Sequence, residues 1–149
     1  MEELGERINF YEKKEPFYEF SNFFLKPVEI REKEWPTTEH FFQAMKFEGK
    51  PEEEKIRTAV RPGDAFRLGR SLPGRREDWE EVKEDYMLEA LRAKFTQHAD
   101  LKEVLLKTGS AYLSEHTKRD SYWGDGGNDS GKNRLGHLLM KVREELKEN

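Results

Sequence analysis

Three polar side chains in the segment 37–47 have the types and the spacing that a ligand site needs. If this segment is an α-helix, Glu39, Gln43 and Lys46 fall within about 60° of one another and extend about 10 Å along the axis. Polar groups beside an aromatic wall are typical of a pocket for a flat ligand. That wall is offered by nearby aromatic residues: Phe10, Phe17, Phe20, Phe23, Phe24 and Trp35. The alternative is an ordinary solvated helix face, and the pattern alone favours neither.

Two carboxylates lie close to Trp123 in the sequence. Asp120 and Asp125 bracket this tryptophan. A carboxylate desolvated by an aromatic ring has a raised pKa, which suits a general acid. An aspartate in a tight turn is the alternative, and spacing does not choose between them.

A glycine-rich segment, 124–131, leads directly into a predicted helix. Free amides at a helix N-terminus suit an anion such as phosphate, and glycine lets the anion approach the backbone. The segment lacks the spacing of a Walker loop and of a calcium loop. A surface turn is therefore the commoner interpretation of these glycines.

Composition excludes several classes of function. There is no Cys, so neither a disulfide scaffold nor cysteine-ligated zinc is expected, and a cytoplasmic setting is the default. The four histidines have no zinc-ligand spacing, so we expect no metal and no other cofactor. The net charge of −4 gives no basic field for general nucleic-acid binding. Met1–Glu6 carries no apolar signal-peptide core, and no run is long enough to span a membrane.

The chain of 149 residues suits one domain, and its 18 aromatic residues argue against disorder. Apolar spacing, prolines and caps predict a mostly helical α+β domain, residues 1–149, with a small β-sheet. Strands are predicted at 8–11, at 28–35 as a strand or hairpin, and at 112–113. Helices are predicted at 36–47, 52–60, 62–69, from 78 to about 95, at 100–108, and from the glycine-rich segment to about 146.

Several ordered motifs resemble those of the NADAR family, also called YbiA-like. They are Ile8-Asn9-Phe10-Tyr11, Glu19 to Phe23, Trp35 to Phe47, Gly69-Arg70, Lys94-Phe95, Thr108-Gly109, Asp120-x-x-Trp123-Gly124-x-Gly126 and Gly131-x-Asn133-x-Leu135-Gly136. The similarity extends from about residue 8 to 146. One departure is Phe17-Tyr18, where relatives often carry Tyr-Gly.

The resemblance implies an N-glycosidase that cleaves the bond between ribose and a nitrogen of a flat heterocycle. The substrates it implies are ribosylamino-pyrimidine phosphates of riboflavin synthesis or ADP-ribose attached to guanine. Three residues are implied to be catalytic, namely Glu39, Lys46 and Asp120. The residues implied to bind substrate have three roles. Phe20, Trp35 and Trp123 would stack on the base, and Asn22 and Gln43 would hydrogen-bond ribose or the base edge. Gly124, Gly126 and Asn133 would form the phosphate side, with Arg70 as a clamp.

Two catalytic routes fit these residues. Glu39 can stabilise positive charge on the sugar or activate water, with Asp120 as acid or orienting group. Alternatively, neutral Lys46 attacks the ring-opened ribosylamine and forms a Schiff base. A non-catalytic module that binds ADP-ribose or a nucleotide is the competing function, and a structural partner protein is a third.

Overall fold

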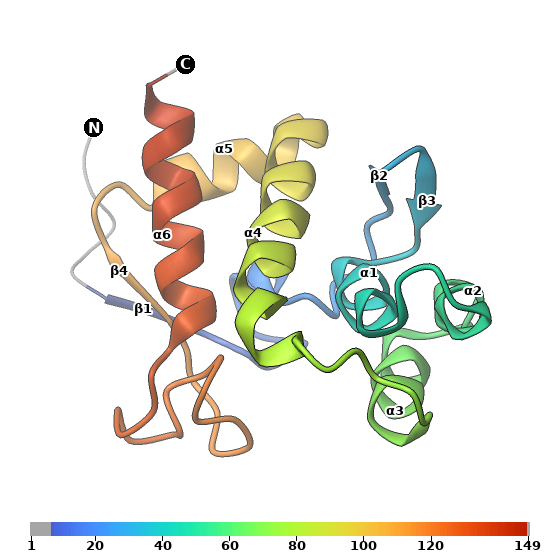
Figure 1. The fold of residues 1–149 in the computed structure, drawn as a ribbon. Helices are drawn as coiled ribbons and strands as arrows, with labels where there is room; N and C mark the ends of the chain where they lie inside the picture. Colours follow the sequence, from blue (N-terminus) through green and yellow to red (C-terminus); the bar gives the residue numbers. More distant parts are fainter. Residues whose placement is uncertain (1–6, 149) are drawn as a thin grey trace. The chain divides into compact units, whose positions relative to one another are not determined.

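The computed structural model describes residues 7–148, which form two compact units. One unit comprises the described residues up to Ser21 together with those from Phe95 onwards, and the other comprises Asn22–Lys94. Figure 1 shows the ribbon coloured along the chain. The expectation that there is no signal-peptide core concerns residues 1–6, which lie outside the described part. The single domain over residues 1–149 stays a prediction.

The first unit, built from both ends of the chain, contains a parallel pair of strands. β1 (Arg7–Phe10) lies beside β4 (Tyr112–Glu115), with Ile8 opposite Leu113 (Figure 1). Side chains alternate between the two faces of a strand. Ile8 and Phe10 of β1 are accordingly buried, whereas its two polar residues are exposed.

Two helices complete the core of the first unit. α6 (Arg134–Lys147) packs against β4, and α5 (Ala99–Lys107) packs against α6 (Figure 1). The apolar stripe expected for α6 is buried, and it comprises Leu135, Leu138, Leu139, Val142 and Leu146. Just after α5, Gly109 has φ +64°, a left-handed conformation that glycine adopts at a helix C-terminus without steric cost. A short 3-10 helix, η1 (Tyr18–Phe20), was not expected from the sequence.

The second unit begins with an antiparallel hairpin. β2 (Val28–Ile30) pairs with β3 (Lys33–Trp35), so the segment 28–35 is a hairpin rather than one strand. Arg31 and Glu32 form its two-residue turn, and both have positive φ, as such hairpin turns require. The Arg31 guanidinium is held by the Glu89 carboxylate, with Nε 3.0 Å from Oε2.

Helices make up the rest of the second unit. α1 (Thr38–Ala44) continues into a 3-10 turn, η2 (Met45–Phe47), and packs against both α2 (Pro51–Arg57) and α3 (Pro62–Ser71) (Figure 1). α2 and α3 each begin at a proline, whose fixed φ suits the first helical position. α4 (Trp79–Gln97) contributes buried side chains, including Trp79, Tyr86, Met87, Ala90 and Leu91.

The expected fold class, a mostly helical α+β structure, is confirmed. The predicted small sheet is, over residues 7–148, two separate two-stranded sheets, one in each unit. The strand pairing could not be read from the sequence, because β1 and β4 lie far apart along the chain.

Candidate active site

The acid of the predicted polar stripe lies in the first turn of α1. The Thr37 hydroxyl caps this helix by accepting a hydrogen bond from the His40 amide at 3.2 Å. The Asn22 carbonyl accepts a second one from the Glu39 amide at 3.2 Å. These bonds fix the first turn and with it the backbone of Glu39. The Glu39 residue is only 6% exposed.

Asn22 supports the same turn with its side chain. Its Oδ1 accepts a hydrogen bond from the Thr38 hydroxyl at 2.7 Å, and its Nδ2 lies 3.3 Å from the Met87 Sδ. Both ends of the amide are therefore engaged within the second unit. In this structure Asn22 anchors α1, and its contact to ribose or base stays a prediction.

Gln43 lies one helical turn after Glu39 and faces it. Gln43 Nε2 donates to Glu39 Oε2 at 2.8 Å. Gln43 is 4% exposed, and among the described residues its Oε1 has no hydrogen-bond partner. The alternative of a solvated helix face is wrong for these two residues, because every residue of α1 is buried.

Lys46, the third member of the stripe, lies in η2 and is half-buried. Its Nζ is 3.4 Å from the Gly69 carbonyl oxygen and 5.8 Å from the centre of the Trp79 ring. Burial lowers the pKa of Lys46, and the nearby Arg75 and Arg70 add to this effect, while Glu39 and Glu80 oppose it. A lysine in this setting reaches its neutral, nucleophilic form at a lower pH than a solvated one.

Arg70, predicted as a clamp, is exposed on α3. Its guanidinium lies 5.2 Å from the centre of the Phe66 ring, and the Phe66 ring lies 6.3 Å from that of Phe23. No ion pair of Arg70 is found among residues 7–148. The exposed Phe66, which the sequence analysis did not single out, shares one face of α3 with Arg70 because it lies four residues earlier.

Asp120, predicted as an acid, lies in a turn of the first unit. Its Oδ1 accepts hydrogen bonds from the amides of Tyr122 and Trp123 at 2.9 and 2.8 Å. This is the hydrogen bonding of an aspartate that forms a turn with its own backbone. The Trp123 ring is half-buried and packs edge-on against Tyr122, with ring centres 4.9 Å apart.

The amides of the glycine-rich segment are largely used within the first unit. Those of Asp125, Gly126, Gly131 and Lys132 donate to backbone carbonyls of residues 115, 120, 125 and 121. At the start of α6, the amides of Arg134 and Leu135 donate to carbonyls of residues 122 and 123. A phosphate at this loop would have to displace these bonds.

The predicted binding residues of this segment have packing roles. A Cβ on Gly124 would come within 2.8 Å of the Asp120 carbonyl oxygen, and Gly126 has φ +76°. Asn133 is buried, and its Nδ2 donates to the Leu113 carbonyl at 2.9 Å. Its Oδ1 accepts a hydrogen bond from the Glu115 amide at 3.0 Å, which ties α6 to β4.

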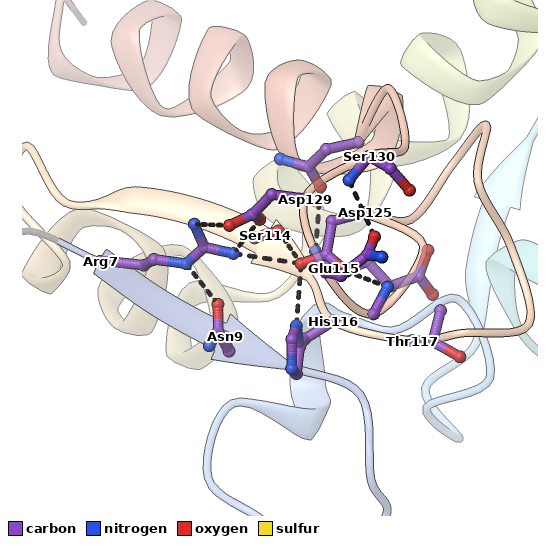
Figure 2. A network of polar contacts seen from close by, with 12 residues as sticks. Arg7, Asn9, Ser114, Glu115, His116, Thr117, Asp125, Asp129 and Ser130 are labelled. Carbon is purple, nitrogen blue, oxygen red and sulfur yellow. Dashed lines mark hydrogen bonds and ion pairs between the residues drawn. The ribbon is translucent and has the colours of Figure 1, made fainter.

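Asp125 is the centre of a polar network in the first unit (Figure 2). Its Oδ2 accepts from the Ser114 hydroxyl at 2.7 Å and lies 2.9 Å from the His116 Nδ1 and 3.1 Å from a guanidinium nitrogen of Arg7. Its Oδ1 accepts from the Gly127 amide at 2.7 Å. The carboxylate is thus bound on both oxygens.

The sequence left a raised pKa and a tight turn open for Asp125, and the pKa of this carboxyl is not raised. Burial alone would raise the pKa of this carboxyl, but the hydrogen bonds from His116, Ser114 and the Gly127 amide outweigh burial and hold the pKa below its usual range. Two of these partners, Ser114 in β4 and His116 just after it, come from another segment of the chain, and the Gly127 amide comes from the same turn. Asp125 is therefore a charged structural group rather than a general acid.

Two predicted stacking residues lie in the cores of their units. Phe20 is completely buried, with its ring 5.6 Å from that of Phe10 and 6.0 Å from that of Phe95. Trp35 is also completely buried, and its Nε1 donates to the Ile30 carbonyl at 3.1 Å. Rings packed in this way are not open to a stacking ligand in this conformation.

A membrane-spanning helix and a cluster of metal-binding side chains are both absent from the described residues. Between residues 7 and 148, no helix has the length and apolar character needed to cross a bilayer. In the same part of the chain, no three His, Asp or Glu side chains are placed to hold a metal ion together.

The arrangement around α1 combines three chemical capacities. A buried carboxylate accepts a hydrogen bond from an amide, and a half-buried amine with a lowered pKa lies near them. A carboxylate stabilises a positively charged sugar centre or activates water, and a neutral amine adds to a carbonyl-level carbon. The segment 39–46 is therefore a candidate site for acid–base or nucleophilic chemistry.

Comparison with known proteins agrees with this chemistry. A model of the NADAR domain family matches residues 9–147. "N-glycosidase YbiA" of Escherichia coli (strain K12) is 52% identical over 141 residues, which cover 93% of this chain and 88% of that protein. "Riboflavin biosynthesis protein VVA0006" of Vibrio vulnificus is 40% identical over 146 residues, 97% of this chain and 40% of that protein.

A solved structure is also similar. The NMR structure of the E. coli protein YbiA has a TM-score of 0.88 and 50% sequence identity to this chain. The match covers 95% of this chain and 85% of that one. The fold is thus shared over nearly the whole chain.

Proposed function

The chain belongs to the NADAR domain family, and on that premise we propose that it is an N-glycosidase that hydrolyses the ribose–nitrogen bond of a phosphorylated ribosyl heterocycle. The observation that carries the proposal is the buried Glu39 bonded to Gln43, followed three residues later by Lys46, whose pKa is lowered by burial. A relative named as a riboflavin biosynthesis protein favours a ribosylamino-pyrimidine phosphate over ADP-ribose attached to guanine.

In the first route, Glu39 acts on the sugar. As the bond between the anomeric carbon and the nitrogen breaks, positive charge develops on the ribose and negative charge on the leaving base. The Glu39 carboxylate stabilises the positive centre or takes a proton from the attacking water, and a proton goes to the leaving nitrogen. The products are the free base and ribose phosphate. Asp120 stays a predicted donor of that proton.

In the second route, Lys46 acts as the nucleophile. A ribosylamine that opens its ring presents an imine carbon, to which the neutral Nζ of Lys46 adds. The heterocyclic amine leaves with a proton, and the sugar stays on Lys46 as a Schiff base. Water then hydrolyses this Schiff base to the sugar aldehyde and regenerates the amine. The lowered pKa of Lys46 supports this route.

Arg70 is the residue that we assign to the substrate phosphate. It is exposed, and its guanidinium lies over the Phe66 ring. Its positive charge helps to lower the pKa of Lys46. A guanidinium binds phosphate through two parallel hydrogen bonds. The glycine-rich segment, the alternative predicted from sequence, already uses its amides internally. Trp123, Gly124, Gly126 and Asn133 stay predictions for substrate binding.

The proposal is tested by product analysis. The purified chain is incubated separately with a ribosylamino-pyrimidine phosphate and with an ADP-ribosylated guanine, and free base is measured by mass spectrometry. Release from either substrate supports an N-glycosidase, and release from only one identifies the substrate class. Binding of both without release favours the non-catalytic nucleotide-binding module instead.

The two catalytic routes are separated by trapping. Borohydride reduces a Schiff base to a stable amine, so the second route predicts a sugar adduct that peptide mapping assigns to Lys46. The Lys46→Ala variant serves as control and gives no adduct. A wild type without an adduct, together with an active Lys46→Ala variant, would leave only the carboxylate route.

A further inference from the structure

Gln43 is buried, and its amide donor is used by Glu39 rather than left open for a ligand. Building on the proposed function, we propose that Gln43 is a positioning residue that holds the Glu39 carboxylate, and that Gly69 on α3 is the residue that leaves room for it. The observations that carry this are one hydrogen bond, one unpartnered buried oxygen and one close approach of two helices.

The hydrogen bond uses the donor of the Gln43 amide. Nε2 lies 2.8 Å from Glu39 Oε2, four residues earlier on the same helix. Such pairs face each other on a helix surface. An amide N–H that donates to a carboxylate favours its ionised form and restricts its rotation. Both effects act on Glu39, the group proposed to meet the developing positive charge.

The other end of the amide points to α3 rather than to a polar partner. Gln43 Oε1 is buried without a hydrogen bond among the described residues, which is unfavourable for stability. A Cβ built on Gly69 would overlap this oxygen and lie within 2.8 Å of Gln43 Cδ and 2.9 Å of Gln43 Cβ. Only a residue without a side chain fits at position 69 while Gln43 keeps this conformation.

Glycine in the body of a helix is itself unfavourable, so position 69 needs a reason. The same helix supplies a comparison, since a Cβ on Gly63 would meet only an Arg67 nitrogen at 3.7 Å. Gly63 is thus replaceable, whereas Gly69 is not. The Gly69 carbonyl also accepts a hydrogen bond from Lys46 Nζ at 3.4 Å. A shift of α3 at this point would therefore disturb both Glu39 and Lys46.

The first test replaces Gln43 by methionine, which keeps the length of the side chain but removes the donor and the orphan oxygen. We expect the melting temperature of the Gln43→Met protein to stay close to that of wild type, because removal of the unpartnered oxygen offsets loss of the hydrogen bond to Glu39. We expect kcat to fall by roughly tenfold or more with KM nearly unchanged, because the lost interaction acts on the catalytic carboxylate. The acid limb of the kcat/KM pH profile should move to higher pH, since ionised Glu39 loses a hydrogen bond.

The second test compares alanine at the two glycines of α3. Gly69→Ala should lower kcat as Gln43→Met does and also lower the melting temperature, because Gln43 must move. Gly63→Ala is the matched control and should keep wild-type kcat and melting temperature. If Gly69→Ala does not fold, the Gln43→Met result decides alone.

The outcomes separate this inference from the proposed function. If wild type is active and Gln43→Met raises KM without lowering kcat, Gln43 is a substrate contact and the inference is overturned. Unchanged kinetics would overturn it as well. If wild type releases no base from either substrate, the proposed function fails. The inference is then judged by carbon NMR titration of labelled glutamates, where the Glu39 midpoint must be higher in Gln43→Met, with Glu39→Gln used to assign the signal.

Discussion

The two units each bury a carboxylate, but they treat it differently. Asp125 in the first unit has hydrogen-bond or ion-pair partners on both oxygens, and its pKa is held low (Figure 2). Glu39 in the second unit is bonded to an amide whose own oxygen has no partner among the described residues, near a lysine with a lowered pKa. The compensated charge of Asp125 stabilises the fold, whereas the unpartnered Gln43 oxygen and the lowered pKa of Lys46 mark the surroundings of Glu39 as a place for chemistry.

The largest expected effect comes from removing the charge at Glu39. Glu39→Gln keeps the shape of the side chain, so the fold should persist. Turnover should fall by a factor on the order of 100 or more, as for other acid–base groups, while substrate still binds. Steady-state release of base and a binding titration on the same sample measure this. A fully active Glu39→Gln protein would break the contrast between the two carboxylates.

Asp125→Asn probes the other side of the comparison. The variant removes the charge that Ser114, His116 and the Gly127 amide bind, while Arg7 keeps Asp129 as a charged partner. The free energy of unfolding should therefore fall by about 1.5–3 kcal/mol near neutral pH. Because the folded-state pKa of Asp125 is lowered, its contribution is present above the unfolded value and is lost as the pH falls through the folded one. Wild type should thus lose stability in acid faster than the variant does. Denaturant unfolding at several pH values checks this, and parallel curves would contradict it.

The phosphate contact can be located by comparing two cations that lie over aromatic rings. Arg70 lies over Phe66 in the second unit, and Lys132 lies over Tyr122 beside the glycine-rich loop. Loss of a charged hydrogen bond predicts that Arg70→Ala raises KM about tenfold or more for a phosphorylated substrate. It should not affect the same substrate without phosphate. The opposite result, with Lys132→Ala alone raising KM, would move the phosphate to the first unit.

The smallest expected effect is a shift in pH dependence. If Lys46 is the nucleophile, it must be neutral, so kcat/KM rises with pH through the pKa of its amine. Burial lowers that pKa, which places the midpoint below the ordinary lysine value of about 10.5. A pH–rate profile of wild type measures this midpoint, and a rate that is independent of pH in the alkaline range would favour the carboxylate route.

The sequence predicted much of the fold because the informative signals were local. The apolar stripe of α6 and the prolines that begin α2 and α3 act within a few residues of one another. The parallel pairing of β1 with β4 was not predicted, since it joins residues from opposite ends of the chain. For the same reason the contact of Asp125 with Arg7 was not predicted, and the sequence did not choose between a raised pKa and a tight turn for this carboxylate.

For the candidate site, residue types were predictable but surroundings were not. The spacing of Glu39, Gln43 and Lys46 placed them on one stripe, yet only packing against α3 shows that Gln43 is buried against Gly69. Phe66 was overlooked because a single exposed phenylalanine has no sequence signature. For the glycines at 124 and 126 the sequence left an anion site and a surface turn open, and their close backbone contacts and left-handed conformation are typical of a turn.

The most direct test crosses two variants with two assays. Glu39→Gln and Asp125→Asn are each measured for release of free base, well below their melting temperatures, and for the free energy of unfolding. We predict that Glu39→Gln loses turnover and keeps stability, and that Asp125→Asn loses stability and keeps most of its turnover per folded molecule. If Glu39→Gln keeps its turnover, or if its loss only follows unfolding, the assignment of the chemistry to α1 is contradicted.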